Sequence, residues 1–400
     1  MNTIKKSFLL FSFLLISFCL KAQIDSAMLK QISKQIQKDY APDKRSIYFN
    51  IQFKGDTVLA ESTSEIALTE WNKQVKDLKG TKVNVPLPAK SLNGMEYGLA
   101  NLSVCNNRAM PQNAAEMMTQ MILGTPVQVL KKQGAYYLVR TPDGYLSWTD
   151  GTAVSLLNKQ DFEAWKKAKR IIFTEDFGHA LSKVDATAER VSDLVKGNIL
   201  EVKGEEKNFY KVVFPDKRIG FVKKREAKIF IDWLKTPSPN ADAILKTAKT
   251  LVGVPYLWGG TSIKGVDCSG FTKTSYFLNG IVIPRDASQQ ALVGEDVEVL
   301  ENDSISISKC LKNLKPGDLL FFAAAKLRGV TGGKITHTAI YMGDGEFIQA
   351  AGMVRINSLK SDANNFDERE SKTLVSAKRF LNQIGQPEIT RVDQHKWYVN

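Results

Sequence analysis

Hydrophobic and polar residues change their spacing along the chain, and these changes predict its domains. Between residues 28 and 36 the apolar positions recur at helical spacing, whereas between residues 47 and 53 they alternate with polar ones. A second helical pattern covers residues 71–78. Since a period of 3.6 indicates a helix and alternation a strand, residues 23–95 are predicted to form a small α+β unit with a helix, a hairpin and a second helix.

The next part of the chain repeats itself with an offset of 73 residues. Each copy alternates apolar and polar residues over short runs separated by Pro-Asp turns, a pattern typical of a small all-β barrel. We therefore predict barrels at residues 96–158 and 169–231, joined by a short helix over residues 161–169. The matched pairs are Gly124 and Gly197, Val129 and Val202, Tyr137 and Tyr210, Val139 and Val212, Pro142 and Pro215, Asp143 and Asp216, and Trp148 and Phe221.

A third domain is predicted over residues 237–382, after a Pro-rich break. Apolar positions at helical spacing over residues 244–252 predict its opening helix, and residues 319–322 predict a buried strand. A loop over residues 323–334 is expected to rim a cleft, because connecting segments next to buried strands often carry function.

Cys268 is the candidate nucleophile of this third domain. Phe271, Ser275 and Leu278 follow it at helical spacing, and Asn279-Gly280 is a typical helix stop, so Cys268 is expected on the first turn of a helix. The free N–H groups and the dipole at a helix start favour a thiolate. A lowered pKa of the Cys268 thiol, helped by an imidazole partner, is therefore expected.

His337 opens a predicted hairpin whose turn lies at residues 343–345. If Asp344 is the centre of that turn, His337 lies diagonal to Gln349 on one face of the sheet, within reach of a long side chain. The result is a triad in which His337 takes the proton of Cys268 and later protonates the leaving amine. The Gln349 carbonyl is expected to accept a hydrogen bond from His337 Nδ1.

Four short motifs between about residues 240 and 380 point to one family. They are Asp267-Cys268-Ser269-Gly270, Tyr256-x-Trp258-Gly259-Gly260, Pro284-Arg285 with Gln290, and His337 with Ile340-Tyr341. In these motifs the chain resembles the NlpC-type cell-wall cysteine peptidases. The resemblance implies an α+β, papain-like domain in which the Cys-bearing helix packs on an antiparallel sheet that carries the His. The third triad residue is often His in that family, where this chain has Gln349.

The resemblance also implies an activity and an arrangement of domains. Members of the family hydrolyse peptidoglycan stem peptides, usually between D-glutamate and a diamino acid such as meso-diaminopimelate. The predicted barrels resemble bacterial SH3-like domains, and in multi-domain members the first barrel narrows the cleft and favours short peptides with a free N-terminal L-Ala. A polar insertion over residues 106–116 matches the long loop of that barrel, so Glu116 would face the amine, unless the loop is merely solvated.

The resemblance suggests further substrate-binding residues, each of which has a structural alternative. Asp267, Ser269 and Tyr256 match family positions that line the amine subsite or assist the oxyanion, and a carboxylate and hydroxyls suit an ammonium. Asp267 fits a helix N-cap as well. Tyr256 and Trp258 also fit aromatic residues packed in a core. Arg285 matches a position that is mainly structural.

Composition and the first residues predict the compartment. Lys5 and Lys6 precede an apolar run that is too short to span a bilayer, so residues 1–22 are predicted to be a cleaved secretory signal, which gives a periplasmic protein without an integral membrane segment. Cys19 follows Phe18 where a lipidation motif wants a small residue, which disfavours a lipoprotein. Removing three lysines with this segment lowers the net charge from +13 to +10.

The remaining composition narrows the class of protein. Lys and Arg are scattered, without zinc spacing or a nucleic-acid signature, so neither nucleic-acid binding nor a metal or other cofactor is expected. The predicted function is therefore a secreted cysteine endopeptidase of γ-D-glutamyl to diamino acid bonds, with peptidoglycan stem peptides as its partners. The alternatives are a wall-binding protein with a weak or inactive site, and a related amidase or acyltransferase.

Overall fold

The computed structural model describes residues 26–235, 239–302, 304–324 and 334–399, which fall into two compact units divided after Leu92. The predicted signal segment and Cys19 lie outside the described residues, as does most of the loop predicted over residues 323–334. No helix in the described part of the chain is long and apolar enough to cross a membrane.

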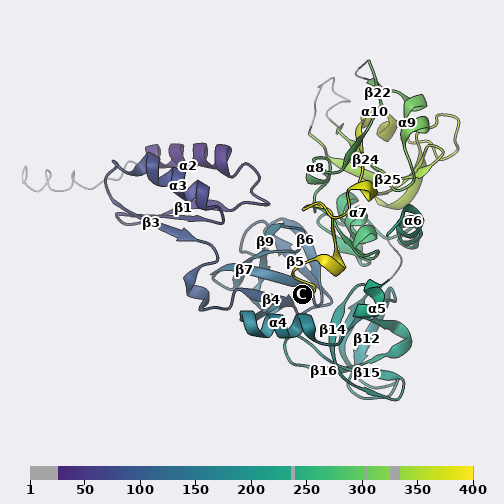
Figure 1. Ribbon diagram of the computed structural model, residues 1–400, viewed down its shortest axis with the longest axis horizontal. Helices are drawn as coiled ribbons and strands as arrows, with labels where there is room; N and C mark the ends of the chain where they lie inside the picture. Colours follow the sequence, from purple (N-terminus) through teal and green to yellow (C-terminus); the bar gives the residue numbers. More distant parts are fainter. Residues whose placement is uncertain (1–25, 236–238, 303, 325–333, 400) are drawn as a thin grey trace, which may run out of the picture. The chain divides into compact units, whose positions relative to one another are not determined.

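The first unit is a three-stranded sheet with two helices on one face (Figure 1). The helices pack through Leu29, Ile36 and the fully buried Trp71, whereas Met28, at the start of the apolar pattern, is exposed. The third strand pairs in parallel with the second, across a helical crossover, and was not predicted. The elements are α2 (Ser26–Tyr40), β1 (Phe49–Lys54), β2 (Thr57–Ser62), α3 (Glu65–Val75) and β3 (Thr81–Pro86).

The second unit begins with two seven-stranded sheets that have the same strand order. Each strand of the second sheet starts 73 residues after its counterpart in the first, which confirms the repeat. The first sheet contains β4 (Tyr97–Ala100), β5 (Val104–Arg108), β6 (Met117–Ile122), β7 (Pro126–Gln133), β8 (Tyr136–Arg140), β9 (Leu146–Asp150) and β10 (Val154–Leu157). The second contains β11 (Arg170–Phe173), β12 (Phe177–Leu181), β13 (Arg190–Val195), β14 (Ile199–Glu206), β15 (Phe209–Val213), β16 (Ile219–Lys223) and β17 (Ala227–Ile229).

The predicted insertion of the first barrel is shorter than expected. Residues 106–108 continue β5 and pair with β6, where the fully buried Asn107 lies opposite Thr119. The loop therefore covers only residues 109–116. The connector between the sheets is the helix α4 (Lys159–Lys167), which agrees with the predicted position to within two residues. A short helix, α5 (Phe230–Leu234), follows the second sheet.

The remaining chain is an α+β domain built on a six-stranded antiparallel sheet. In order across the sheet its strands are β21 (Glu295–Val297), β28 (Leu374–Arg379), β24 (Leu319–Phe322), β25 (His337–Gly343), β26 (Glu346–Ala351) and β27 (Met353–Ser358). Its helices are α6 (Ala241–Thr250), α7 (Cys268–Phe277), α8 (Ala287–Gln290), α9 (Ile307–Asn313) and α10 (Glu368–Thr373). Two-stranded pairs are formed by β18 (Thr261–Ser262) with β19 (Gly265–Val266), β20 (Ile281–Val282) with β29 (Thr390–Arg391), and β22 (Leu300–Glu301) with β23 (Ser304–Ile305).

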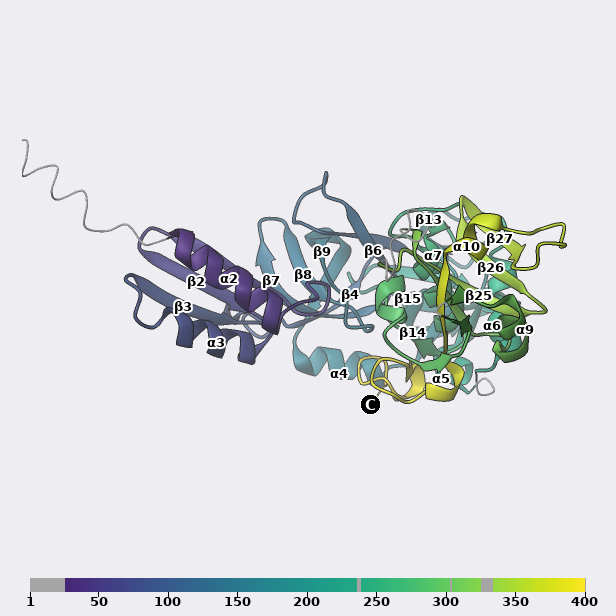
Figure 2. The ribbon, with the colours of Figure 1, turned by 90° about the horizontal axis from the view of Figure 1, so that it is seen from above.

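Helix α7 packs on one face of this sheet (Figure 2). Phe271 and Tyr276 of the helix are fully buried in one apolar cluster with Ile340 of β25 and Ile348 of β26. A second apolar cluster, which contains Cys310 of α9, is formed by the intervening side chains of the same strands, which point to the opposite face of the sheet. Since side chains alternate along a strand, both faces of the sheet are covered.

The first barrel is docked directly on the α+β domain. Lys273 of α7 forms an ion pair with the buried Asp143 at 2.5 Å, and Tyr145 donates a hydrogen bond to Asp286 at 3.0 Å. Thr261 donates its backbone N–H to the Gln120 side chain at 3.1 Å. Burial opposes ionisation of Asp143, but Lys273 outweighs it and holds the pKa of this carboxyl below its usual value.

Replacing Asp143 with Asn is expected to lower the midpoint of thermal unfolding by about 5 °C at neutral pH, because it leaves Lys273 largely buried without its partner. Since the folded pKa of Asp143 is depressed, the difference from the wild type is present at neutral pH and shrinks as the pH falls through that pKa. Lys203→Gln, which breaks the exposed pair with Glu201, is the control and is expected to leave the midpoint unchanged. A D143N midpoint equal to the control's would contradict the role of this pair.

Candidate active site

Cys268 is the first residue of α7, as predicted. Asp267 is the N-cap, with extended backbone, and its carboxylate accepts a hydrogen bond from Gly270 N at 2.6 Å. A side chain at Gly270 would collide with the Gly260 carbonyl oxygen, so glycine is needed for the helix to start this close to the preceding loop. Cys268 is 7% exposed, and the backbone amides of Ser269 and Thr338 are close enough to its thiol to lower its pKa.

Thr338 follows His337 at the start of β25, so the thiol lies against the strand that carries the imidazole. Ile340 pairs with Ile348 across the hairpin, a register that puts Gln349 diagonal to His337, as the sequence predicted. His337 Nε2 lies 2.6 Å from Gln349 Oε1. The predicted contact through Nδ1 is wrong. The nitrogen that meets Gln349 across the hairpin is Nε2, so Nδ1 points away from Gln349.

Two further residues fix the orientation of the Gln349 amide. Its Nε2 donates to Asn357 Oδ1 at 3.0 Å and to Asp367 Oδ2 at 3.3 Å, while Asn357 Nδ2 donates to the Asn365 carbonyl at 3.3 Å. The Asn365 carbonyl and the Asp367 carboxylate can only accept hydrogen bonds. The side-chain NH₂ groups of Asn357 and Gln349 must therefore point toward these acceptors, which fixes the direction of each hydrogen bond in the series. The Gln349 carbonyl therefore faces His337, whose Nε2 carries the proton and whose Nδ1 keeps a lone pair for a thiol proton.

Asn357 and Asp367 were missed in the sequence. Asn357 lies on β27 opposite Phe347, which makes it a diagonal neighbour of Gln349. The cross-strand rule that connects His337 to Gln349 also connects Gln349 to Asn357, once the third strand is known. Asp367 comes from the N-cap of α10, and no local pattern links it to the hairpin.

The resting charge state differs from the sequence prediction. Burial, followed by the nearby Asp267 carboxylate, raises the pKa of the Cys268 thiol to about 12, although the amides of Thr338 and Ser269 oppose this shift. Burial also lowers the pKa of His337, in spite of the opposing Glu370 carboxylate. The predicted lowering of the Cys268 pKa is therefore wrong in direction, because desolvation outweighs the helix start, and both shifts favour the neutral forms of the thiol and the imidazole.

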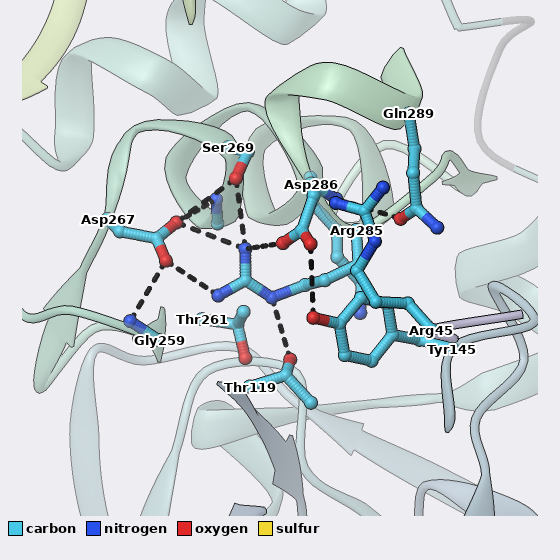
Figure 3. A network of polar contacts seen from close by, with 12 residues as sticks. Arg45, Thr119, Tyr145, Gly259, Thr261, Asp267, Ser269, Arg285, Asp286 and Gln289 are labelled. Atoms are coloured by element: carbon cyan, nitrogen blue, oxygen red, sulfur yellow. Dashed lines mark hydrogen bonds and ion pairs between the residues drawn. The ribbon is translucent and has the colours of Figure 1, made fainter. Parts of the chain in front are cut away.

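Asp267 and Ser269 belong to a buried polar network centred on Arg285 (Figure 3). Arg285 is 1% exposed and binds the Asp267 carboxylate with both terminal nitrogens, at 2.7 and 3.1 Å. It also donates to Ser269 Oγ at 3.0 Å and to Thr119 Oγ1 of the first barrel at 2.8 Å. Gly259 N donates to Asp267 as well, at 2.9 Å.

Asp267 is therefore the N-cap of α7, which was the structural alternative for this residue, and Arg285 balances its charge inside the protein. The mainly structural position that the resemblance implies for Arg285 agrees with these contacts, in which one guanidinium makes several hydrogen bonds. Thr119 extends the clamp to the barrel, a contact that depends on the tertiary structure.

Tyr256, Trp258 and Glu116 lie on the accessible side of the site. Trp258 is 60% exposed, which excludes a core position, and its indole N–H donates to Glu116 Oε1 at 2.9 Å. Tyr256 is half-buried, and burial raises the pKa of its hydroxyl, so it remains a hydrogen-bond donor at neutral pH. The barrel approaches this loop closely, because a side chain at Gly259 would collide with the Met117 carbonyl. Within the described residues, no group of three His, Cys, Asp or Glu side chains is placed to hold a metal ion.

Comparison with known proteins decides the family. The NlpC/P60 family model matches residues 253–369, and the model of the bacterial dipeptidyl-peptidase SH3 domain matches residues 107–154. A γ-D-glutamyl-L-lysine dipeptidyl-peptidase of Bacillus cereus is 30% identical over 247 residues, which cover 60% of this chain and 68% of the relative. The protein of the same name from Bacillus subtilis is 30% identical over 58% of this chain and 72% of its own length. The chain belongs to the NlpC/P60 family.

Solved structures show the same fold. An NlpC/P60 protein from Bacillus cereus aligns with a TM-score of 0.57 at 23% identity, over 71% of this chain and 99% of its own. An NlpC/P60 endopeptidase from Photobacterium damselae aligns with a TM-score of 0.53 at 16% identity, over 89% of this chain and 91% of its own. This NlpC/P60 chain is thus a cysteine-peptidase-type hydrolase of a cell-wall family, with an SH3-like region before a papain-like domain.

Replacing Asn357 with Leu is expected to lower kcat about tenfold with little change in KM, because the Gln349 amide loses the acceptor that orients it. Asn357→Asp is the matched control, since a carboxylate still accepts from Gln349, and its kcat should stay within about threefold of the wild type. The assay is hydrolysis of a stem peptide followed over pH.

The same pH series tests the charge state of His337. In the wild type kcat/KM should fall on the acid side with a midpoint below 6.5, because His337 must be unprotonated and its pKa is lowered. The added charge of N357D should move that midpoint to higher pH. Equal kcat for the two variants, with unmoved midpoints, would show that Asn357 is merely structural.

Proposed function

We propose that this NlpC/P60 protein is a secreted endopeptidase that hydrolyses the bond between γ-D-glutamate and the diamino acid of peptidoglycan stem peptides. The observation that carries the proposal is the hydrogen bond between His337 and the oriented Gln349 amide, on the strand that packs against the helix of Cys268, because it leaves His337 Nδ1 as the nitrogen that can accept a thiol proton. The names of the two Bacillus relatives support the choice of bond. Secretion rests on the pattern of residues 1–22.

The reaction starts from the neutral pair. His337 Nδ1 takes the proton of the Cys268 thiol while the sulfur attacks the carbonyl carbon of the γ-amide, so the thiolate need not exist beforehand. The charge that develops on the carbonyl oxygen is met by the Cys268 backbone N–H and by the Tyr256 hydroxyl. His337 then gives its proton to the amine of the diamino acid, whose bond to carbon breaks, and leaves a thioester.

Hydrolysis of the thioester completes the cycle. His337 is neutral again and takes a proton from water, whose oxygen attacks the thioester carbonyl, and the released Cys268 sulfur regains a proton. The imidazolium forms only during each step, and the Gln349 carbonyl stabilises it by accepting from Nε2.

The first barrel supplies specificity for the other end of the peptide. A free L-Ala ammonium that enters beside Trp258 meets the exposed Glu116 carboxylate, whereas the charge of Asp267 is already neutralised by Arg285. The close approach of Met117 to Gly259 leaves little room for a longer chain on this side. Short peptides with a free N-terminus are therefore the proposed substrates.

Incubation of L-Ala-γ-D-Glu-meso-diaminopimelate with the purified protein should release the dipeptide L-Ala-D-Glu, as measured by mass spectrometry. Cys268→Ala should release none, because the acyl-enzyme cannot form. Intact peptide from both proteins, together with co-sedimentation of the wild type with sacculi, would favour the wall-binding alternative. A different product would indicate an amidase or acyltransferase.

Replacing Glu116 with Gln should raise KM about tenfold for the free tripeptide with little change in kcat, because a charge-assisted contact to the ammonium is lost. The same peptide with an acetylated L-Ala should be a poor substrate for the wild type and should be unaffected by E116Q. If the acetylated peptide is cut as fast as the free one, the amine subsite is wrong.

A further inference from the structure

A cavity of about 540 Å³ lies where the first barrel, the helix α4 and the C-terminal segment, residues 387–399, meet. It shares no lining residue with the cavity of about 510 Å³ beside His337. The C-terminal segment returns to α4 (Figure 1), where Lys166 donates a hydrogen bond to the Lys396 carbonyl at 3.2 Å. Since α4 and this segment lie outside the residues that the two family models match, neither model accounts for the cavity.

Two half-buried aromatic side chains line the cavity, and each is held by a neighbouring ring. Tyr97 stacks on the buried Phe162, with ring centres 4.6 Å apart, and Trp397 meets His395 edge to face at 5.9 Å. His395 is itself fixed, because its Nε2 donates to the Pro142 carbonyl at 3.0 Å and its Nδ1 accepts from the Trp397 backbone N–H at 3.3 Å. The aromatic walls are therefore formed before any ligand binds.

Within the described residues, Arg140 of β8 lines the cavity as a cation without a carboxylate partner. Its side chain makes one hydrogen bond there, from Nη1 to Gln128 Oε1 at 3.0 Å, and burial lowers its pKa. Lys166, by contrast, is already paired with Glu163 at 2.9 Å. Because a partly desolvated charge is costly without a counter-ion, the Arg140 guanidinium is the group of this cavity that an anion would stabilise most.

Two further donors of the cavity lack an acceptor in the described part of the chain. The Gln128 amide uses its oxygen for Arg140, which leaves its NH₂ group unpaired, and the indole N–H of Trp397 is unpaired as well. Guanidinium, amide NH₂ and indole N–H groups can only donate hydrogen bonds. A ligand that satisfies all three must be anionic and rich in acceptor oxygens.

These features fit a sugar ring that carries a carboxylate. A carboxylate matches guanidinium with two parallel hydrogen bonds, and the other oxygen atoms of a sugar can accept from Gln128 and Trp397. The C–H faces of the ring can pack on aromatic side chains. A bare inorganic anion would leave the aromatic walls uncovered, and an apolar ligand would leave the donors unpaired. The volume of the cavity is typical of a small-molecule site.

We propose that this cavity is a second binding site, which takes a sugar that bears a carboxylate group. Arg140 binds the carboxylate, Tyr97 and Trp397 pack on the ring, and the Gln128 amide donates to one of its oxygen atoms. The site uses no residue of the proposed reaction, so it goes beyond the proposed function and does not depend on it.

The test compares N-acetylmuramic acid with N-acetylglucosamine, which lacks the lactyl carboxylate of the first sugar. Titration of the protein by calorimetry should give at least tenfold tighter binding of N-acetylmuramic acid. Arg140→Gln should remove this difference, whereas Arg140→Lys, which keeps the charge but not the two parallel hydrogen bonds, should keep part of it. Equal affinities of the wild type for the two sugars, no binding of either at millimolar concentration, or an unchanged difference in Arg140→Gln would overturn the inference.

Two further variants separate binding in this cavity from a general effect of charge. Arg225→Gln removes an exposed arginine near Glu226 and should bind both sugars as the wild type does. Trp397→Leu should weaken the binding of both sugars about tenfold, because it removes an aromatic wall and keeps Arg140. Wild-type affinities in Trp397→Leu, or a loss in Arg225→Gln as large as that in Arg140→Gln, would refute the site. The midpoint of thermal unfolding, measured for each variant, checks that it is folded.

The carboxylated sugar can be free or part of a glycan chain, and chain length distinguishes these sources. Peptide-free glycan chains that contain N-acetylmuramic acid should bind more tightly than the monosaccharide if the ligand is a glycan, and no more tightly if it is the free sugar. Either result supports the site, provided that Arg140→Gln weakens the binding.

Discussion

The buried ion pair between Asp267 and Arg285 is the interaction on which the rest of the site depends. Asp267 caps the helix that begins with Cys268 and holds the glycine loop through Gly259. Arg285 carries the same network to Thr119 of the first barrel. Taking two charges out of water is costly, and here the cost is offset by a bidentate pair and several further hydrogen bonds. Loss of either partner would leave an uncompensated charge buried inside the second unit.

This clamp has a chemical consequence for the nucleophile. The Asp267 carboxylate that positions Cys268 also disfavours a negative charge on its sulfur, and burial acts in the same direction. Both effects favour a protonated thiol at rest, and in the proposed reaction His337 removes the proton during attack. Such a site protects a nucleophile from adventitious reaction, because the thiolate, not the thiol, is the reactive form.

A neutral Gln in the triad suits this charge state. A carboxylate at position 349 would raise the pKa of His337 and favour an imidazolium, whereas the amide orients the ring with a smaller effect on its charge. The orientation is secured from outside the triad by Asn357 and Asp367, and Asp367 also caps the helix that carries Arg369 and Glu370.

The sequence by itself determined what depends on local periodicity and short-range pairing. The repeat of 73 residues, the helix start at Cys268 and the diagonal position of Gln349 all follow from spacing along the chain, because each involves neighbours on one helix, hairpin or barrel. The tertiary structure decided the direction of the Cys268 pKa shift, the use of His337 Nε2, the contact of Thr119 with Arg285, and the cavity beside His337. These depend on burial and on contacts between separate elements of the fold, which periodicity and short-range pairing do not reveal.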